Sequence, residues 1–420
     1  MAAADEKLNW TIMRTQPLAD GLGTWAIPKT LERLRQAGAH VVLCDTEEEE
    51  GLIAAVKKHR PNIIVSTYAK LSKSVLDAAL PALKAVIKSG TGIDALDIDA
   101  MKALNIPVTN LPDYGAAAVA ECALLLLINL SRGMNIVSRE CLATGWCDPD
   151  LPGVRGMDLF GKTLGLIGVG HIGSHIAHIG LGLGMKVHAC DPAVSAEAMA
   201  ELGVIKVESI DEICATADVV VPMLPLSKET EGIISAERIA MMKSSAILVN
   251  VARGALCDEK ALAEAVRSGN IRGVGADVFS DEPMQLRGGQ FFSDLIGSDN
   301  FVMTPHYGGW TDDCWKLVES MVFDRCEEIM QGRRLTVSST DPRLQGQDRT
   351  KVRYARGTGA PLRVSLPALM RQRVAAARQA NGVSGGRRDA MLSGSVWYLA
   401  VPVAFAAGWC CATTARRWWL

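Results

Sequence analysis

The sequence predicts an α/β protein built from two doubly wound parallel sheets, with the second domain inserted into the first. Apolar runs alternate with amphipathic stretches of ten or more residues in the first hundred residues, and the alternation resumes further along the chain. This alternation indicates parallel sheets with helices on both faces. A glycine-rich turn begins at residue 168, far from the N-terminus, so another domain is expected to fold before it.

Four apolar runs predict the strands of the first sheet. They are WTIM (10–13), HVVLC (40–44), NIIVS (62–66) and KAVIKSG (84–90), with helical patterns over about residues 28–37 and 48–59. Each run has the length of a buried strand, and each amphipathic stretch has the length of a helix.

A long apolar stretch, AAAVAECALLLLINL (116–130), opens the second region and predicts a linking helix. It is shorter than a membrane span requires, which favours packing in a core or at a dimer interface. Apolar runs near residues 163, 186, 218, 246 and 273 predict five further strands with helices between them.

After the last of these strands the chain is expected to return to its first domain. The string TPHYGG (304–309) is followed by TDDCWKLVESMVFDRCEEIMQG (311–332), which has the pattern of an amphipathic helix. We therefore predict a first domain of residues 1–112 plus 304–344 and an inserted domain of residues 113–303. Two crossings between the lobes would let a cleft close on a ligand.

Three short strings each carry a polar group where an apolar, strand-like run ends. They are NVARG (250–254), ADVFSDEP (276–283) and TPHYGG, and the groups are Arg253, Glu282 and His306. Ligand sites of α/β folds lie at the carboxyl ends of strands. The three strings therefore indicate a common site.

These side chains together suit chemistry on a 2-oxo acid. Arginine can pair two ways with a carboxylate and a carbonyl, and histidine can pass a proton to or from the carbonyl oxygen. A carboxylate such as Glu282 would fix the histidine tautomer. Singly, each has a structural alternative: Arg253 as an ion pair at a helix start, Glu282 as a solvated loop carboxylate, and His306 as a capped turn residue.

The turn GVGHIG (168–173) has the context of a dinucleotide fingerprint, because it follows the apolar run KTLGLIG and precedes an apolar-periodic stretch. Gly168 allows the tight turn, Gly170 lets the backbone approach a pyrophosphate, and Gly173 lets helix and strand pack closely. The pyrophosphate would lie at the positive start of the helix.

Asp191 follows the next apolar run, KVHAC (186–190). An acidic side chain there bonds both ribose hydroxyls of NAD and repels the 2′-phosphate of NADP. The predicted cofactor is therefore NAD, with NADP less favoured. The alternative for Asp191 is a turn residue before Pro192.

Together these strings resemble the D-isomer-specific 2-hydroxyacid dehydrogenase family, which includes glyoxylate/hydroxypyruvate reductases, phosphoglycerate dehydrogenases and D-lactate dehydrogenases. The resemblance covers about residues 8–340. It rests on strings in the family's order: SGTGIDALDID (89–99), VAECALLLLINLSRG (119–133), GMDLFGKTLGLIGVGHIG (156–173) and PLSKETEGII (225–234). The resemblance implies a Rossmann NAD-binding domain, 113–303, inserted into a flavodoxin-like substrate-binding domain.

The resemblance also implies roles for individual residues. Arg253 would bind the substrate's carboxylate and carbonyl, His306 would be the acid/base, and Glu282 would pair with it. The backbone at Thr91 and Gly92 would hold the substrate carboxylate. Contacts with NADH are implied for the carboxylate of Asp277, which would bond the carboxamide, for the amides of His171 and Ile172, and for Pro225, Thr230 and Ala252.

Two residues depart from the family's pattern. Ala95 stands where relatives often have Asn or His, and Met223 stands where a histidine is frequent near the adenine. Tyr307 and Trp310 lie close to the predicted acid/base and indicate either an enclosed apolar rim or ordinary packing residues.

Other polar patterns favour structural roles. His171, His175 and His178 fall at helical spacing, but the first lies within the phosphate turn, so no metal site is expected. Eleven cysteines occur without CxxC or paired zinc spacing, which is typical of reduced thiols in a cytoplasmic protein. The opening MAAADEKLNW has neither a basic region nor an apolar core, so no signal peptide is indicated.

Charge divides the chain at about residue 345. Residues 345–420 contain twelve Lys and Arg against two Asp, whereas the first 344 residues hold 32 basic and 44 acidic side chains. So acidic a body indicates no nucleic-acid partner. The basic, low-complexity tail is typical of a disordered segment, although 396–413 is long enough for a marginal membrane anchor. Gene read-through, a partner-binding tail and an anchor stay open.

Two functions are therefore expected, in order. The first is hydride transfer between NADH and C2 of a small 2-oxo acid, yielding a D-2-hydroxy acid, by a cytoplasmic enzyme whose resemblance implies a homodimer. The second is an NAD-sensing, corepressor-like binding protein, because transcriptional corepressors resemble this family and carry the same three polar residues.

Overall fold

The computed structural model describes residues 10–15, 26–112, 114–282, 295–333, 335 and 341–344. The predicted tail, 345–420, lies outside the described residues, as does its apolar run at 396–413. Pro283, the last residue of the string ADVFSDEP, also lies outside them.

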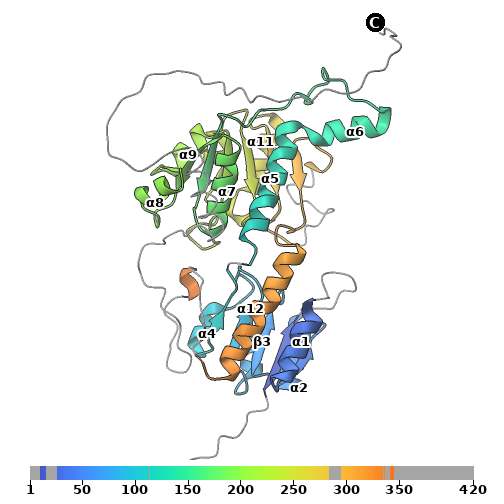
Figure 1. Ribbon diagram of the computed structural model, residues 1–420, viewed down its shortest axis with the longest axis vertical. Coiled ribbons are helices and arrows are strands. Elements are labelled where there is room, and N and C mark those ends of the chain that lie inside the picture. Colours follow the sequence, from blue (N-terminus) through green and yellow to red (C-terminus); the bar gives the residue numbers. More distant parts are fainter. Residues whose placement is uncertain are drawn as a thin grey trace, which may run out of the picture. The chain divides into compact units, whose positions relative to one another are not determined.

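The N-terminal region forms a parallel sheet of five strands in the order β2-β1-β3-β4-β5 (Figure 1). The strands are β1 (Thr11–Thr15), β2 (His40–Leu43), β3 (Ile63–Ser66), β4 (Ala85–Lys88) and β5 (Val108–Thr109). Because helices cover both faces, β3 and β4 are buried along their whole length. This explains why their sequences are continuous apolar runs and not alternating ones.

Helices pack on both faces of this sheet. One face carries α2 (Glu49–His59), α3 (Lys73–Ala79) and α4 (Ile98–Ala103), and the other carries α1 (Ala26–Gln36) and α12 (Asp312–Met330). Helix α12 follows the second sheet in sequence, yet its buried face contacts the core around β1 and α1. The chain therefore returns to the first sheet after completing the second.

A buried ion pair joins the start of the chain to this returning helix. The guanidinium of Arg14, on β1, donates two hydrogen bonds of 2.7 Å to the carboxylate of Glu319, on α12. Their side chains are only 1% and 3% exposed. A bidentate pair of this kind fixes the orientation of both partners.

The second sheet has seven parallel strands in the order β12-β11-β10-β9-β6-β7-β8. They are β6 (Thr163–Ile167), β7 (Lys186–Cys190), β8 (Ile205–Lys206), β9 (Val219–Pro222), β10 (Ile247–Asn250), β11 (Gly273–Ala276) and β12 (Phe301–Met303). Read from β8, the order of its first six strands is that of a doubly wound dinucleotide-binding sheet. The order reverses between β6 and β9, where such sheets bind their ligands.

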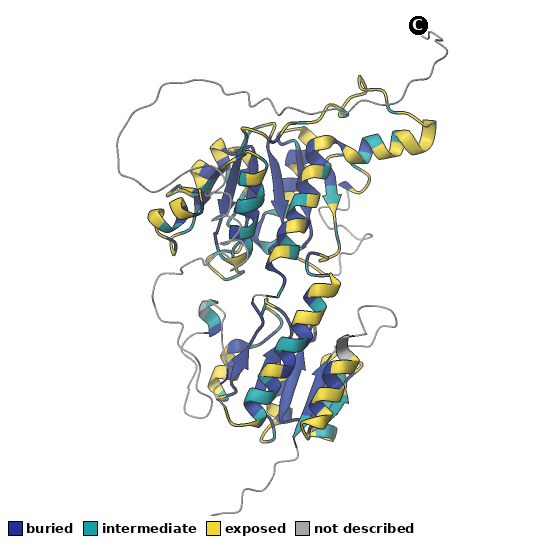
Figure 2. Ribbon diagram, viewed as in Figure 1, coloured by how far each residue is buried: buried dark blue, intermediate teal, exposed yellow. Residues whose placement is uncertain are grey.

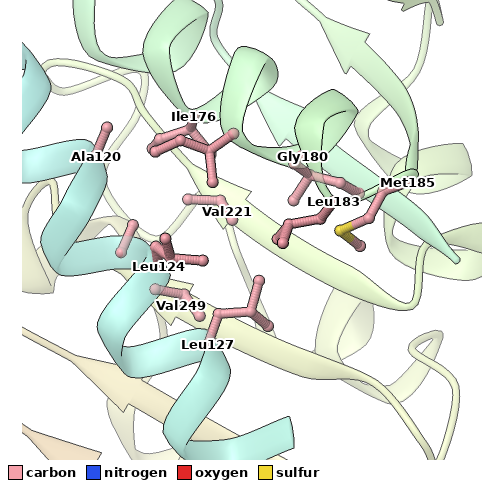
Figure 3. Close-up of a pocket in the computed structure, with 12 residues that line it drawn as sticks. Ala120, Leu124, Leu127, Ile176, Gly180, Leu183, Met185, Val221 and Val249 are labelled. Carbon is pink, nitrogen blue, oxygen red and sulfur yellow. The ribbon is translucent and has the colours of Figure 1, made fainter. Parts of the chain in front are cut away.

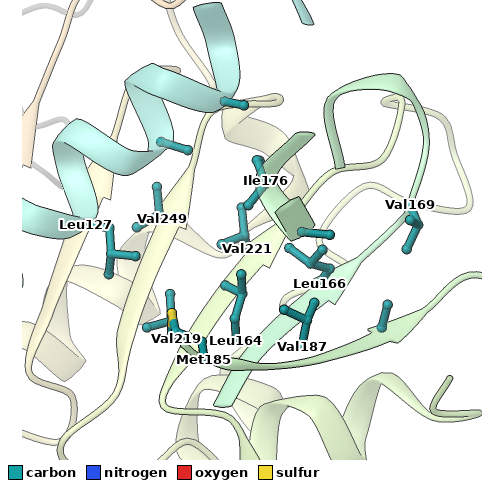
Figure 4. Close-up of a cluster of buried hydrophobic side chains, with 14 of the residues drawn as sticks. Leu127, Leu164, Leu166, Val169, Ile176, Met185, Val187, Val219, Val221 and Val249 are labelled. Carbon is teal, nitrogen blue, oxygen red and sulfur yellow. The ribbon is translucent and has the colours of Figure 1, made fainter. Parts of the chain in front are cut away.

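Two apolar cores cover the faces of this sheet. One core contains residues of α5 (Ala116–Arg132), α7 (His171–Gly182) and α8 (Ala196–Glu201), and Figure 4 shows its side chains converging on the strands. The other contains residues of α9 (Ile210–Thr216), α10 (Ala236–Ala240) and α11 (Glu259–Ser268). Burial is concentrated in the strands, while the outer sides of the helices are exposed (Figure 2). The predicted fold class, two doubly wound sheets with the second inserted in the first, is confirmed.

Helix α5 ends at Gly133, whose φ of +61° is the left-handed conformation that glycine adopts at helix ends. Helix α6 (Met134–Thr144) begins directly afterwards. Two short 3-10 turns, Gly254–Leu256 and Pro342–Leu344, complete the described elements. Among the described helices none alone has the length and apolarity of a membrane span, although α5 and α6, bent by 64°, pass such a test together.

A small apolar pocket lies between α5, α7 and the strands beneath them (Figure 3). Its lining includes Leu124 and Leu127 of α5 and Ile176 of α7, together with Leu183 and Met185. Leu127, Ile176 and Met185 belong to the core of the second sheet, and Leu183 packs against it. The lining contains no titratable side chain, so we interpret the pocket as a packing gap in that core.

Candidate active site

The three strings that carry Arg253, Glu282 and His306 follow three neighbouring strands, as predicted. NVARG begins at the end of β10, ADVFSDEP begins at the end of β11, and TPHYGG follows β12. These strands lie side by side and run parallel. Their carboxyl ends therefore meet at one edge of the sheet.

His306 and Glu282 form a hydrogen-bonded pair at this edge. The Nδ1 atom of His306 lies 2.8 Å from Oε2 of Glu282, and Oε1 of Glu282 accepts a 2.9 Å bond from the Phe279 amide. Burial alone would raise the pKa of Glu282, but the hydrogen bond and charge of His306, the Phe279 amide and the charge of Arg253 together lower it. The carboxylate is thus held ionised and fixed on one ring nitrogen, leaving Nε2 for other contacts.

The loop that presents His306 is organised by Asp277, which is 1% exposed. Its Oδ1 accepts bonds from the Thr304 hydroxyl at 2.5 Å and the Tyr307 amide at 2.6 Å, and Oδ2 accepts one from the Gly308 amide at 2.9 Å. The His306 amide donates to the Asp277 carbonyl at 2.7 Å. His306 itself has a φ of +56°, a costly conformation for a residue with a side chain. This network therefore stabilises an otherwise unfavourable backbone.

Arg253 is held by two acceptors. Its Nε donates to Oδ2 of Asp94 at 2.8 Å, and its Nη1 donates to the carbonyl of Ala252 at 2.5 Å. The amide of Asn250, buried at the end of β10, donates to the Arg253 carbonyl at 2.8 Å and fixes the turn. Nη2 lies 1.6 Å from where a Cβ on Gly92 would be, so only glycine permits this approach.

The loop at Thr91 and Gly92 therefore lies against the guanidinium. Its backbone is fixed by the amide of Asn110, which donates to the Thr91 carbonyl at 2.6 Å, and by the Thr91 hydroxyl, which donates to the Leu111 carbonyl at 3.1 Å. Arg253 thus lies against the predicted substrate loop, and His306 is paired with Glu282, whose pKa the charge of Arg253 helps to lower.

Three residues of this region were not predicted from the sequence. Asp94 binds Arg253, Lys88 is buried beside the same loop, and Tyr114 has its hydroxyl 3.5 Å from where a Cβ on Gly309 would be. Burial, then the charge of Arg253, lowers the pKa of Lys88 to about 8. Burial raises the pKa of Tyr114 to about 12. Lys88 directly precedes the string SGTGIDALDID, and Asp94 lies within it. Their closeness to this string was the sequence signal that could have identified them as residues of the site.

Aromatic side chains lie beside His306. The ring centroids of Tyr307 and Trp310 are 6.0 Å apart, and the ring planes are inclined at 58°. Tyr68 is 54% exposed and Tyr307 is 45% exposed, so neither is a core residue. Tyr307 is therefore not a core packing residue, and its place at a substrate rim stays a prediction.

The glycine-rich turn has the shape that a dinucleotide needs. Gly168 has a φ of +103°, and a Cβ there would lie 2.5 Å from the Met223 carbonyl oxygen. A Cβ on Gly173 would lie 2.4 Å from the Gly168 carbonyl oxygen, whereas a Cβ on Gly170 would meet nothing within 4 Å. The protein therefore leaves space beside Gly170. His171 starts α7 there, so the turn lies at the positive end of a helix, where an anion is favoured.

Asp191 lies at the end of β7 and is oriented by the same turn. Its Oδ2 accepts a 2.8 Å bond from the Val169 amide, and its Oδ1 accepts a 2.9 Å bond from the Ala193 amide. Each oxygen keeps capacity for a further donor. The carboxylate therefore lies where β6 and β7 end, next to the glycine turn.

The remaining predicted cofactor residues lie in two loops at the ends of β9 and β10. The Thr230 hydroxyl donates to the Pro225 carbonyl at 2.7 Å and accepts from the Ser227 amide at 2.8 Å. Ala252 is buried, and its amide donates to Asn250 at 3.1 Å. The Thr230 side chain thus shapes its own loop.

Within the described ranges, no group of three or more His, Cys, Asp or Glu side chains could hold a metal ion. His178 Nδ1 bonds its own helix at the Ser174 carbonyl, at 2.7 Å. Burial, then the charges of His178 and His171, lowers the pKa of His175.

The two sheets, the open glycine turn at the switch point and the acidic residue after β7 define a dinucleotide-binding α/β protein. Comparison with known proteins makes this specific. Residues 124–308 match the family model for the NAD-binding domain of D-isomer specific 2-hydroxyacid dehydrogenases. The chain belongs to the D-isomer specific 2-hydroxyacid dehydrogenase family.

Individual relatives agree with this assignment. The chain is 34% identical over 270 residues to D-3-phosphoglycerate dehydrogenase of Methanocaldococcus jannaschii, covering 64% of this chain and 50% of the relative. It is 35% identical over 246 residues to glyoxylate reductase of Thermococcus onnurineus, covering 58% of this chain and 71% of the relative. The chain spans about half the length of the phosphoglycerate dehydrogenases that it matches.

Solved structures share the fold. D-lactate dehydrogenase from Aquifex aeolicus, complexed with NAD and lactic acid, superposes with a TM-score of 0.69 at 28% identity, covering 77% of this chain and 96% of that one. The match to an NAD-binding domain and this neighbour support a nicotinamide cofactor.

Proposed function

We propose that this protein is an NAD-dependent oxidoreductase that interconverts a small 2-oxo acid and its D-2-hydroxy acid. The observation that carries the proposal is that the His306–Glu282 pair and Arg253 follow three adjacent parallel strands of a dinucleotide-binding sheet. The relatives named above are dehydrogenases and reductases, which favours catalysis over an NAD-sensing binding protein.

Arg253 would bind the substrate by its carboxylate and carbonyl oxygens. Its Nε is engaged by Asp94 and its Nη1 donates to Ala252, whereas Nη2 lies over Gly92. A substrate carboxylate between this guanidinium and the backbone of Thr91 and Gly92 would receive charge-assisted hydrogen bonds. The same guanidinium would polarise the carbonyl.

His306 would donate a proton to the carbonyl oxygen during reduction and accept it during oxidation. Glu282 holds Nδ1 at 2.8 Å, so Nε2 is the nitrogen left to exchange a proton with substrate. Glu282 also stabilises the imidazolium by its charge. A bound NADH would supply the hydride that reduces C2.

We propose NAD in preference to NADP. Asp191 would accept bonds from the ribose hydroxyls and repel a 2′-phosphate. The turn Gly168, Gly170 and Gly173, with the amides of His171 and Ile172, would hold the pyrophosphate. Pro225, Thr230, Ala252 and the carboxylate of Asp277 would contribute the remaining contacts.

The domain division, the assembly and the location are part of the same proposal. Residues 1–112 plus 304–344 would bind substrate and residues 113–303 would bind NAD. A homodimer is supported by exposed apolar side chains along α5 and α6, among them Leu125, Ile128 and Leu142. The nine free cysteines of the described residues suit a cytoplasmic location, where thiols stay reduced.

The test is NADH oxidation with glyoxylate, hydroxypyruvate and pyruvate, repeated with NADPH. Turnover of at least one acid, with NADH preferred, is expected. Binding of NADH without turnover of any 2-oxo acid would contradict the enzymatic function.

His306→Gln tests the acid/base role directly. Loss of a positioned proton donor should lower kcat by about 10²- to 10⁴-fold, while the Kd for NADH changes by less than about twofold, as fluorescence titration would measure. The exposed His40 gives the control variant His40→Gln, which should keep full activity. If His306→Gln instead abolished NADH binding, the residue would have a structural role.

A further inference from the structure

Asp94 lies between two arginines that come from distant parts of the chain. Its Oδ2 accepts the 2.8 Å bond from Nε of Arg253, and its Oδ1 accepts a 3.0 Å bond from Nη1 of Arg343. The side chains of Arg253, Asp94 and Arg343 are 29%, 32% and 30% exposed, respectively. The carboxylate is therefore shared between two cations in a region that is partly withdrawn from water.

The contact of Asp94 determines which edge of Arg253 faces the substrate loop. With Nε bound to Asp94 and Nη1 donating to the Ala252 carbonyl, Nη2 is directed over Gly92. A rotated guanidinium would lose this geometry, because the planar fork binds a carboxylate only when both nitrogens of one edge face it.

Arg343 is itself fixed by its own segment. Its Nη2 donates to Oδ2 of Asp341 at 2.7 Å, and its Nε lies 3.1 Å from Oδ1 of the same carboxylate. The next residue, Leu344, is 3% exposed and belongs to the core that packs α2, α3 and α4 on the first sheet. Arg343 is therefore anchored to the substrate side of the site.

We infer that Arg343 is a positioning residue for the substrate: it acts through Asp94 and sets how Arg253 presents its charge. This inference rests on the proposed function. Arg343 binds one oxygen of Asp94, so the negative charge of Asp94 is divided between Arg343 and Arg253. Without Arg343, that charge would act on Arg253 alone, would compete with the substrate carboxylate, and would let the guanidinium turn towards a bidentate pairing with Asp94.

The electrostatics of Asp94 agree with this arrangement. Burial alone would raise the pKa of Asp94, but the charges and hydrogen bonds of Arg253 and Arg343 lower it. Both arginines therefore interact with an ionised Asp94 throughout the neutral range.

The experiment compares steady-state kinetics of the full chain with the best 2-oxo acid of the panel. Arg343→Gln should raise KM for the acid by about two- to fivefold, the range expected for a partly exposed ion pair, with kcat and the Kd for NADH nearly unchanged. Arg343→Lys keeps the charge and should lie closer to wild type. Arg333, which pairs with Glu327 at 3.0 Å, gives the control Arg333→Gln, which should not change KM.

A double variant separates positioning from a general loss of structure. Asp94→Asn should raise KM by itself, and adding Arg343→Gln should have no further effect, because Arg343 acts only through the charge of Asp94. Independent, multiplying effects would overturn the inference, and so would an unchanged KM in Arg343→Gln or a fall in kcat at constant KM.

Binding of oxalate to the NADH complex, followed by the fluorescence of the bound NADH, distinguishes a failure of the proposed activity from a failure of the positioning role. If the wild type turns over no acid but oxalate binds less tightly to Arg343→Gln, the proposed activity fails and the positioning role stands. If oxalate binds wild type and Arg343→Gln equally, the positioning role fails whether or not the enzyme is active.

Discussion

Lys88 is a buried cation at the last position of β4, next to the loop of Thr91. Its ammonium group donates to the carbonyls of Thr67 and Ser89 and thereby joins the ends of β3 and β4. Burial, followed by the charge of Arg253, lowers its pKa to about 8. The folded protein therefore binds this proton less tightly than the unfolded chain does.

This difference predicts a pH dependence of stability. Between pH 8 and the unfolded pKa of 10.5, the unfolded state binds more protons, so the free energy of unfolding should rise with pH. Below pH 8 both states are protonated and the penalty is constant. Between pH 7.5 and 10, the free energy of unfolding of the wild type should therefore rise by a few kcal/mol relative to that of Lys88→Met. The expected slope is about 1.4 kcal/mol per pH unit, and urea unfolding at each pH measures it.

The exposed Lys84, four residues earlier, gives the matched control Lys84→Met. Its effect on the free energy of unfolding is measured over the same pH range and gives the baseline. A pH-independent difference between Lys88→Met and wild type would mean that Lys88 is solvated in the folded protein.

At the residue scale, the sequence predicted the groups of the site and the pairing of Glu282 with His306, but not the partners of Arg253. Arg253, Glu282 and His306 could be found because each follows an apolar run, which marks a strand end. Asp94 and Arg343 could not, because they contact their partners across 159 and 249 residues and carry no local pattern. Such contacts depend on tertiary packing between segments far apart in the chain, which periodicity does not encode.

At the scale of elements, the turn between β6 and α7 contains one glycine that the packing of the fold requires and one that it does not. A Cβ on Gly173 would meet the Gly168 carbonyl oxygen at 2.4 Å, so Gly173→Ala should destabilise the fold by about 1–3 kcal/mol. A Cβ on Gly170 would meet nothing, and its φ of −78° suits any residue. Gly170→Ala should therefore leave the free energy of unfolding within about 0.5 kcal/mol of wild type, yet weaken NADH binding.

Urea unfolding and fluorescence titration with NADH measure the two quantities separately. Gly182→Ala, at the other end of α7 and also without neighbours within 4 Å of the added Cβ, is the control for NADH affinity. Unchanged NADH binding in Gly170→Ala would mean that the cofactor backbone does not approach this turn.

Long elements were predictable and short ones were not. The runs at 62–66 and 84–90 became β3 and β4, and the pattern at 48–59 became α2 (Glu49–His59). By contrast, β5 and β8 have two residues each, too few for any period to register. The break between α5 and α6 was also missed, because it depends on one glycine, Gly133, in a left-handed conformation.

At the scale of the whole molecule, the Arg14–Glu319 pair connects β1 to α12. With both side chains nearly inaccessible, Glu319→Met would leave a buried guanidinium without this carboxylate. Breaking such a pair from one side should lower the free energy of unfolding by about 3–5 kcal/mol, as urea titration would measure. Replacing both residues by Met should cost much less, because no charge remains buried.

The exposed pair Lys73–Asp77, with side chains 62% and 47% exposed, provides the comparison. Lys73→Met should change stability by less than about 1 kcal/mol. Equal losses from Lys73→Met and Glu319→Met would show that burial does not govern the strength of these pairs.

The return of α12 to the first sheet also orders events during synthesis. Arg14 must wait for Glu319, 305 residues later, and at ribosomal speeds this takes on the order of tens of seconds. The strands of the second sheet, 163–303, all emerge before α12 does. Meanwhile the apolar face formed by Ile12 and Leu34 lacks its cover of Val318 and Val322. The first sheet is therefore begun before the second and completed after it, and its apolar face is uncovered during that interval.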